Sequence, residues 1–196
     1  MIGEAHAPGA TPLDPDEAAA LLPRHIATQG QLNEWEQANI LAAVQWAVAA
    51  RTKIDLLTDA FVRELHRRMF DRTWRWAGQY RHSDKNIGIE WAHVPTRVRD
   101  MLADIRYWID HDTYPSVETA VRLHHRLVAI HPFPNGNGRH ARLVADLVLS
   151  NLGGSPLPWG RSDLAHETDA RARYIDALHR ADAGDIAPLL MFAQGR

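Results

Sequence analysis

Apolar residues recur every three or four positions along most of this chain, the spacing that places them on one face of a helix. Five long segments follow that pattern, and two shorter ones close the chain. The expected helices start near Leu32, Thr58, Thr96, Ser116 and Leu143, and the two shorter ones cover Ala170–Arg180 and Asp185–Ala193. Thr58 and Ser116 are typical N-cap residues, and Gly153 and Gly154 are a typical stop for the fifth helix.

The segment Gln79–Trp91 (QYRHSDKNIGIEW) departs from the helical pattern. Its apolar residues alternate loosely with polar ones, and the residues between Ser83 and Asn86 favour a turn. We therefore expect a short β-hairpin here, which is too small to fold alone. The predicted fold class is an all-α domain with one small β-hairpin flap.

The two ends of the chain differ from its middle. Residues 1–29 are rich in Pro, Ala and Gly, and the first fourteen predict a loose tail. Residues 30–155 carry the long helical patterns and predict the core of the domain. Residues 156–196 predict short C-terminal helices that pack on this core.

Composition narrows the class of protein. The chain has 196 residues, enough for one domain, and its 22 Lys and Arg are outnumbered by 24 Asp and Glu. Nucleic-acid binding needs a basic face, so this charge balance disfavours it. There is no cysteine, which excludes disulfides and thiolate chemistry. No apolar run approaches the roughly eighteen residues of a membrane span and no signal peptide is visible, so we expect a cytoplasmic protein without a membrane partner.

The segment HPFPNGNGRHAR, residues 131–142, concentrates polar groups between two helical patterns. Gly136 and Gly138 let backbone amides approach a ligand, and the helix that follows has free amides and a dipole that favour an anion. Arg139 and Arg142 lie one turn apart on that helix. The combination indicates a cradle for a polyphosphate. The alternative is a tight connection between two helices with solvated arginines.

His131 falls on the apolar stripe of the preceding helix, so we expect its imidazole at the end of that helix, beside the cradle. A neutral imidazole there can take a proton from a hydroxyl. A packed, structural histidine is the alternative, and it suits His124 better. A zinc site formed by His124, His125 and His131 is a third interpretation, disfavoured because HExxH and cysteine are both absent.

The segment from His131 to Arg142 resembles the signature of Fic domain proteins (the Fic/DOC, or Fido, family), HPFx(D/E)GNGRxxR. The resemblance extends to ETAVRLHHRLVAI before it, to LHRRMF, and to WRWAGQYR with KNIGI, covering about residues 30–155. Within the family the chain looks most like the branch called mobile mystery protein B. Membership implies a nucleotidyltransferase that moves AMP from ATP to a Ser, Thr or Tyr hydroxyl of a target protein.

The resemblance also implies roles for individual residues. His131 would be the general base that deprotonates the target hydroxyl, and Phe133 would anchor the loop in the core. Phosphates would be held by backbone amides, by the Asn137 side chain and by arginines, within the set Gly136, Asn137, Gly138, Arg139 and Arg142. The hairpin would lie over the site and pair with the target segment through Lys85, Asn86, Ile87 and Gly88. A related branch with lysine in place of Gly138 transfers phosphate, so AMP transfer is favoured here.

The chain departs from the family pattern at Asn135, where an acidic residue helps to bind magnesium. An amide oxygen carries no charge and is a weaker ligand for Mg²⁺ or Mn²⁺. The resemblance therefore implies reduced metal affinity. It leaves open a catalytically weakened module that only binds a nucleotide.

Many relatives carry an inhibitory helix, (S/T)xxxE(G/N), whose glutamate pairs with the last arginine of the motif. The nearest candidates here are Glu36 and Glu34 on the first expected helix, and neither fits the pattern fully. Two solvated glutamates on an amphipathic helix are an equally good interpretation. Without such a brake, a toxin-like protein held in check by a separate antitoxin-like partner is the alternative.

Overall fold

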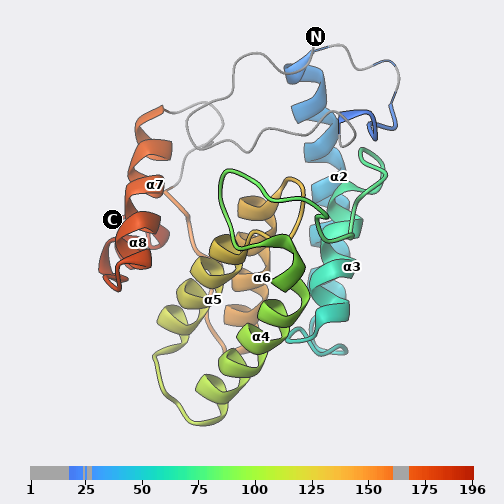
Figure 1. The fold of residues 1–196 in the computed structure, drawn as a ribbon. Coiled ribbons are helices and arrows are strands. Elements are labelled where there is room, and N and C mark those ends of the chain that lie inside the picture. The colour runs from blue at the N-terminus through green and yellow to red at the C-terminus, as the bar shows by residue number, and fades with distance from the viewer. Residues whose placement is uncertain (1–17, 24, 26–27, 161–167) are drawn as a thin grey trace.

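The computed structural model describes residues 18–23, 25, 28–160 and 168–196, and over these residues the protein is helical (Figure 1). The tail expected for residues 1–14 lies outside the described part. The described elements are α2 (Gln29–Ala50), α3 (Asp59–Phe70), the 3₁₀ turn η1 (Trp91–His93), α4 (Val94–Asp110), α5 (Ser116–Ile130), α6 (Asn137–Asn151), α7 (Thr168–Asp182) and α8 (Ala187–Ala193). None of these helices has both the length and the apolar character needed to cross a bilayer.

Helices α5 and α6 lie side by side at the centre and are joined by the short segment 131–136. Helix α4 packs on α5, and α3 packs on α6 and on α2, which forms one edge of the molecule (Figure 1). Helices α7 and α8 pack on each other and on α5 at the opposite edge. The residues of the signature thus connect the two central helices.

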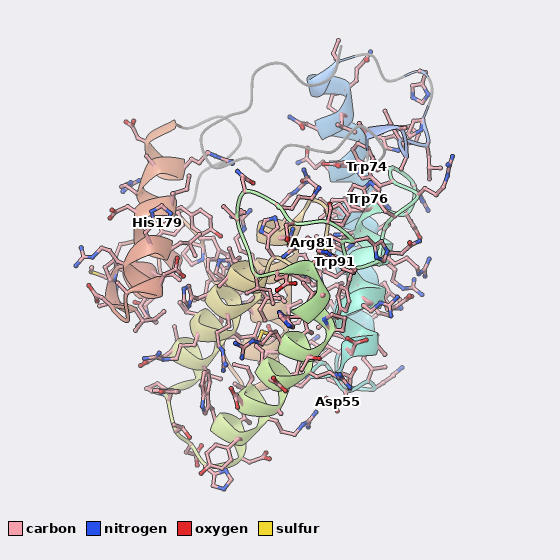
Figure 2. All side chains as sticks on the ribbon, viewed as in Figure 1. Asp55, Trp74, Trp76, Arg81, Trp91 and His179 are labelled. Carbon is pink, nitrogen blue, oxygen red and sulfur yellow. The ribbon has the colours of Figure 1, made fainter. Side chains whose placement is uncertain are left out.

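The β-hairpin expected at residues 79–91 is not formed. The structure describes residues 79–90 as an irregular loop, and the described residues contain one isolated bridge, between Leu21 and Trp74. Arg81 replaces strand pairing, because its side chain bonds to carbonyl groups on both sides of the loop. In the view of Figure 2, Arg81 is labelled in the upper half of the molecule and Asp55 at its lower end. Residues 81–89 are called the Arg81 loop below.

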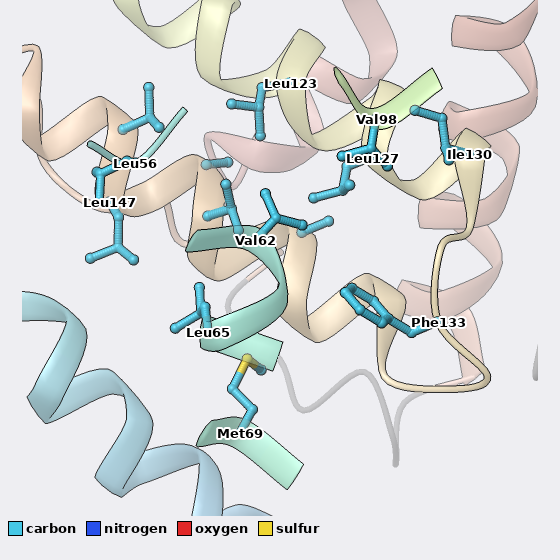
Figure 3. Packing of buried hydrophobic residues seen from close by; sticks show 14 of the residues in the cluster. Leu56, Val62, Leu65, Met69, Val98, Leu123, Leu127, Ile130, Phe133 and Leu147 are labelled. Carbon is cyan, nitrogen blue, oxygen red and sulfur yellow. The ribbon is translucent and has the colours of Figure 1, made fainter. Parts of the chain in front are cut away.

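The core lies between α3, α5 and α6. Val62, Leu65, Leu123, Leu127 and Phe133 have at most 1% of their surface exposed and meet there (Figure 3). Burying side chains of this size supplies the main drive to fold. Phe133 belongs to the segment between α5 and α6, so this connection is fixed to the core.

One helix cap matches the sequence expectation, whereas one cap and one helix start differ from it. Thr58 caps α3 by accepting a hydrogen bond from the Phe61 amide, as expected. Ser116 does not cap α5: the N-cap is Pro115, which has an extended conformation, and Ser116 is the first helical residue. Helix α6 begins at Asn137 rather than at Leu143. The cause is Gly136, which turns the chain directly into the helix with φ 77°.

Candidate functional site

His131 ends α5 in a left-handed conformation, with φ 54° and ψ 61°. A residue with a Cβ adopts this conformation at a cost of about 1 kcal/mol, so the surrounding structure must hold it. Only 5% of His131 is exposed. Burial, and then the nearby charges of Arg81 and Lys85, lower the pKa of His131 to about 4. The imidazole is therefore neutral near pH 7 and can accept a proton.

The connection from α5 to α6 is fixed to α3 through His66. The Gly78 amide donates to Nδ1 of His66 (3.0 Å), so the ring proton lies on Nε2, which donates to the Asn135 carbonyl (3.1 Å). The ring stacks on Phe133 at a centroid distance of 3.6 Å. Burial holds the pKa of His66 well below its usual range, which keeps this neutral form. The buried position of Phe133 and its stacking on His66 are what the anchoring role expected of it requires.

The Asn137 side chain bonds back to the segment that joins α5 to α6. Its Oδ1 accepts from the Phe133 amide (2.9 Å), and its Nδ2 donates to the Phe133 carbonyl (2.8 Å). Both polar atoms are thus used inside the protein, and the phosphate contact expected of this side chain does not fit the geometry. Gly136 could carry no side chain, because an added Cβ would lie 2.5 Å from Cζ of Phe70.

The N-terminus of α6 has no side-chain cap. The amides of Asn137, Gly138 and Arg139 open this helix, and its dipole favours an anion in front of them. An added Cβ at Gly138 would come no closer than 3.7 Å to Oη of Tyr174, so the glycine leaves space there. The backbone part of the predicted phosphate cradle is therefore geometrically available.

Arg142 lies over the ring of Tyr174, with 5.8 Å from Cζ to the centroid. Burial lowers its pKa, and the charges of Arg139 and Arg171 lower it further. The positive charges of Arg139, Arg142 and Arg171 are therefore close enough to act on one another near the start of α6. Tyr174 is partly buried, and desolvation of its hydroxyl raises its pKa to about 12. The hydroxyl lies 3.0 Å from Nε2 of His124. Helix α7 thus forms one wall of the cradle.

Glu36 reaches the cradle from α2, whereas Glu34 is exposed on the same helix. The buried Glu36 carboxylate accepts from Nε1 of Trp74 (2.7 Å) and pairs with Arg139 (2.6 Å). The resemblance predicted a pair with the last arginine of the motif, Arg142. The structure instead pairs Glu36 with Arg139, because α2 lies along α3 and meets α6 on the Arg139 side.

The described residues do not by themselves make a magnesium site. Oδ1 of Asn135 accepts a hydrogen bond from the Gly136 amide (2.6 Å). Across the described ranges no group of three His, Asp or Glu side chains gathers to bind a metal. The histidines considered for zinc have separate partners, since His124 contacts Tyr174 and His125 contacts Asp182.

The residues expected to dock a target lie in the Arg81 loop. Asn86, Ile87 and Gly88 are exposed, and Lys85 is half-buried. Gly88 has φ 96°, and an added Cβ would lie 2.6 Å from Cβ of His131. The loop therefore borders His131 although it forms no hairpin.

Residues 56–149 match the model of the Fic/DOC family. This segment is a Fic/DOC family domain. The protein adenylyltransferase fic-1 of Caenorhabditis elegans is 33% identical over 135 residues, which cover 66% of this chain and 25% of that protein. The protein adenylyltransferase Fic of Aedes aegypti is 30% identical over 147 residues, covering 71% and 28%. The chain thus spans about a quarter of the length of the curated relatives it matches.

Solved structures share the fold. A Fic family protein from Desulfovibrio desulfuricans superposes with a TM-score of 0.66 at 21% identity, over 93% of this chain and 56% of that one. BepC from Bartonella tribocorum, solved with bound AMPPNP, gives 0.66 at 16% identity, over 92% and 97%. The helical fold of this Fic domain is therefore established.

Sequence reasoning missed four contributors to the Fic site: Arg81, His66, Trp74 and Tyr174. His66 could have been found, because it lies on the buried stripe of α3 next to Leu65. Arg81 looked like one more polar residue of a hairpin. Trp74 and Tyr174 lie far from the signature in sequence, and only the packing of α2 and α7 reveals their place.

Proposed function

We propose that this protein is a protein adenylyltransferase that moves AMP from ATP to a Ser, Thr or Tyr hydroxyl of a target protein. The observation that carries the proposal is a neutral, buried His131 held beside the uncapped N-terminus of α6 and its arginines. Two of the relatives reported above are named protein adenylyltransferases, which supports the same reaction.

The chemistry follows from this arrangement. His131 takes the proton of the target hydroxyl, and the hydroxyl oxygen attacks the α-phosphorus of ATP. A bond forms between that oxygen and phosphorus, the bond from the α-phosphorus to the oxygen of the β-phosphate breaks, and pyrophosphate leaves. The amides of α6 with Arg139 and Arg142 stabilise the negative charge. A divalent cation would be held mainly by the phosphates of ATP, where it would neutralise their charge, since Asn135 supplies no carboxylate.

Transfer from ATP labelled in the α-phosphate tests this function. The protein is incubated with labelled ATP and Mg²⁺ or Mn²⁺, alone and with a cell lysate. We expect labelled protein in the wild type and a loss of at least about 100-fold in His131→Ala, because general-base catalysis contributes on this order. His125→Ala is the control, since this histidine of α5 faces Asp182.

A nucleotide-binding module is the second candidate, favoured by Asn135. It predicts nucleotide binding without any label on the protein or in the lysate. Equal labelling of wild type and His131→Ala would contradict catalysis by His131.

We also propose that Glu36 restrains the enzyme, because it occupies Arg139, a residue of the phosphate cradle. Glu36→Gly should raise labelling about tenfold, and Glu34→Gly should leave it unchanged because Glu34 is exposed. Equal labelling of both variants and the wild type would contradict self-restraint through α2. A separate antitoxin-like partner would then be the better explanation of control.

A further inference from the structure

Arg81 is a guanidinium enclosed by the protein, with 1% of the residue exposed. It donates to two carbonyls of its own loop, those of Ser83 (2.8 Å) and Ile89. It also donates to two carbonyls at the end of α5, those of Ile130 (3.5 Å) and His131 (2.7 Å). One side chain therefore joins the loop to the residue proposed as the base.

The main chain repeats this connection. The Arg81 amide donates to the Pro132 carbonyl (3.0 Å), and the Ile89 amide donates to the Ile130 carbonyl (3.5 Å). Three consecutive carbonyls, from residue 130 to residue 132, are thus bound by the two ends of the loop. These carbonyls belong to the turn in which the chain leaves α5 through the left-handed His131.

A buried cation is stable here because the end of a helix carries partial negative charge and unpaired carbonyls. Asp84 adds a carboxylate 3.5 Å from Nη1 of Arg81, although its side chain is mostly exposed. The planar guanidinium can serve carbonyls in several directions at once, which the ammonium of lysine cannot do in the same geometry. The contacts therefore require arginine rather than positive charge alone.

Gly88 completes the fit from the other side of the loop. An added Cβ would lie 2.6 Å from Cβ of His131, 3.1 Å from Nη2 of Arg81 and 3.1 Å from the Ile130 carbonyl. Its φ of 96° is also one that residues with a Cβ rarely adopt. Loop, arginine and histidine are packed without room for a methyl group.

We propose that Arg81 is a positioning residue that holds His131 and the Arg81 loop in one fixed relation, through the carbonyls of residues 130 and 131. The proposal rests on the proposed function, in which His131 is the base, and on the expectation that the loop docks the target segment. These two parts must meet within hydrogen-bond distance for the proton to move. Because Arg81 is only 1% exposed, it would act on the reaction through its neighbours rather than by contact with nucleotide or target.

The test uses two variants of the full chain, Arg81→Lys and Gly88→Ala. The first keeps the charge and removes the branched donor, and the second keeps Arg81 and forces the loop away from His131. Arg63→Lys is the matched control, because Arg63 donates to the Gly78 carbonyl (3.0 Å) just before the loop and lies over Tyr80.

Two measurements need no catalysis: amide hydrogen exchange over residues 81–91, and NMR titration of the His131 imidazole. The charged groups that act on His131 are Arg81 and Lys85. We expect both variants to exchange at least about tenfold faster in the loop and to show a His131 pKa closer to 6.5, because the ring gains water. Arg63→Lys should match the wild type in both measurements.

Kinetics then separate positioning from nucleotide binding. Both variants should lower kcat about tenfold or more and leave KM for ATP within about twofold, because the cradle on α6 is untouched. Wild-type loop exchange and wild-type His131 titration in the folded variants would overturn the proposal, even if kcat falls. If Arg81→Lys fails to fold, Gly88→Ala decides by the same criteria. If the wild type transfers no AMP, the proposed function fails while exchange and titration still decide the role of Arg81.

Discussion

Two arginines border the same site and are held in opposite ways. Arg81 is enclosed and bonds to main-chain carbonyls of the loop and of α5. Arg139 has 36% of its side chain exposed and pairs with one carboxylate, that of Glu36. Main-chain carbonyls cannot leave without moving the backbone, whereas a carboxylate can turn away by changing its rotamer. The part of the site around His131, called the base half below, is therefore fixed by the backbone. The part around Arg139, called the phosphate half, can be freed when the Glu36 carboxylate turns away.

Loss of stability in acid is the largest effect that we expect, and it acts through His131 and three further buried histidines. Burial lowers the pKa of His131 and of His140 to about 4, and it holds those of His66 and His124 well below 6.5. Below about pH 6.5 the unfolded chain binds protons that the folded chain does not, so the free energy of unfolding falls as the pH falls. The histidine contribution is complete above about pH 6.5 and is lost toward the folded pKa values.

Each of these histidines contributes up to roughly 1.4 kcal/mol per pH unit. We expect a loss on the order of 5 kcal/mol between pH 7 and pH 5, measured by urea unfolding. Asp146 acts in the opposite direction, because burial raises its pKa, but it is one group against four. His140→Gln should remove about one proton from the slope. A free energy of unfolding that stays level from pH 7 to pH 5 would contradict this account.

Replacing each arginine by methionine should separate the two halves next. Arg81→Met leaves several enclosed carbonyls without donors, and we expect a loss of about 3 kcal/mol or more. Arg139→Met should cost only about 1 kcal/mol, because the residue is partly exposed and Glu36 keeps its bond from Trp74. Urea unfolding at pH 7 measures both. Similar losses would show that Arg139 is as deeply built in as Arg81.

The helices could be read from the sequence because buried residues repeat with the helical period, as on the Val62–Leu65–Met69 stripe of α3. The start of α6 was missed, since one glycine turn at Gly136 has no periodic signal. The prediction of a hairpin at residues 79–91 was wrong for a related reason. Ile87 and Ile89 alternate with polar residues, but the loop is ordered by Arg81, and a single buried side chain leaves no pattern in a sequence.

The site divides in the same way. His131, Arg139 and Arg142 were readable because one contiguous segment carries them. Glu36 and Glu34 could not be told apart, since the sequence does not say which face of α2 meets α6. Tyr174 reaches the cradle through the packing of α7, a long-range contact that no local spacing encodes.

A smaller effect should follow from loosening Glu36 without removing it. Trp74→Phe deletes the Nε1 donor that holds one oxygen of the carboxylate and leaves the pair with Arg139. If Glu36 restrains the enzyme, AMP transfer should rise about threefold, less than in Glu36→Gly, because one hydrogen bond of about 1 kcal/mol is lost. Trp35→Phe is the control, since its indole donates to the Arg72 carbonyl. Equal rates in the two tryptophan variants would rule out this path of restraint.

The smallest effect concerns the charge of the phosphate half. Asn135→Asp places a carboxylate where the amide oxygen now accepts from the Gly136 amide, and Mg²⁺ prefers carboxylate oxygen. We expect the Mg²⁺ concentration for half-maximal AMP transfer to fall a few-fold, with a modest rise in rate. Asn151→Asp makes the same charge change at the other end of α6 and should change neither. An unchanged Mg²⁺ dependence in Asn135→Asp would mean that this position does not reach the metal. A lower Mg²⁺ concentration for half-maximal transfer would instead place Asn135 with Arg139 in the phosphate half of the site. Both residues could then be changed to alter activity while the Arg81 contacts stayed intact.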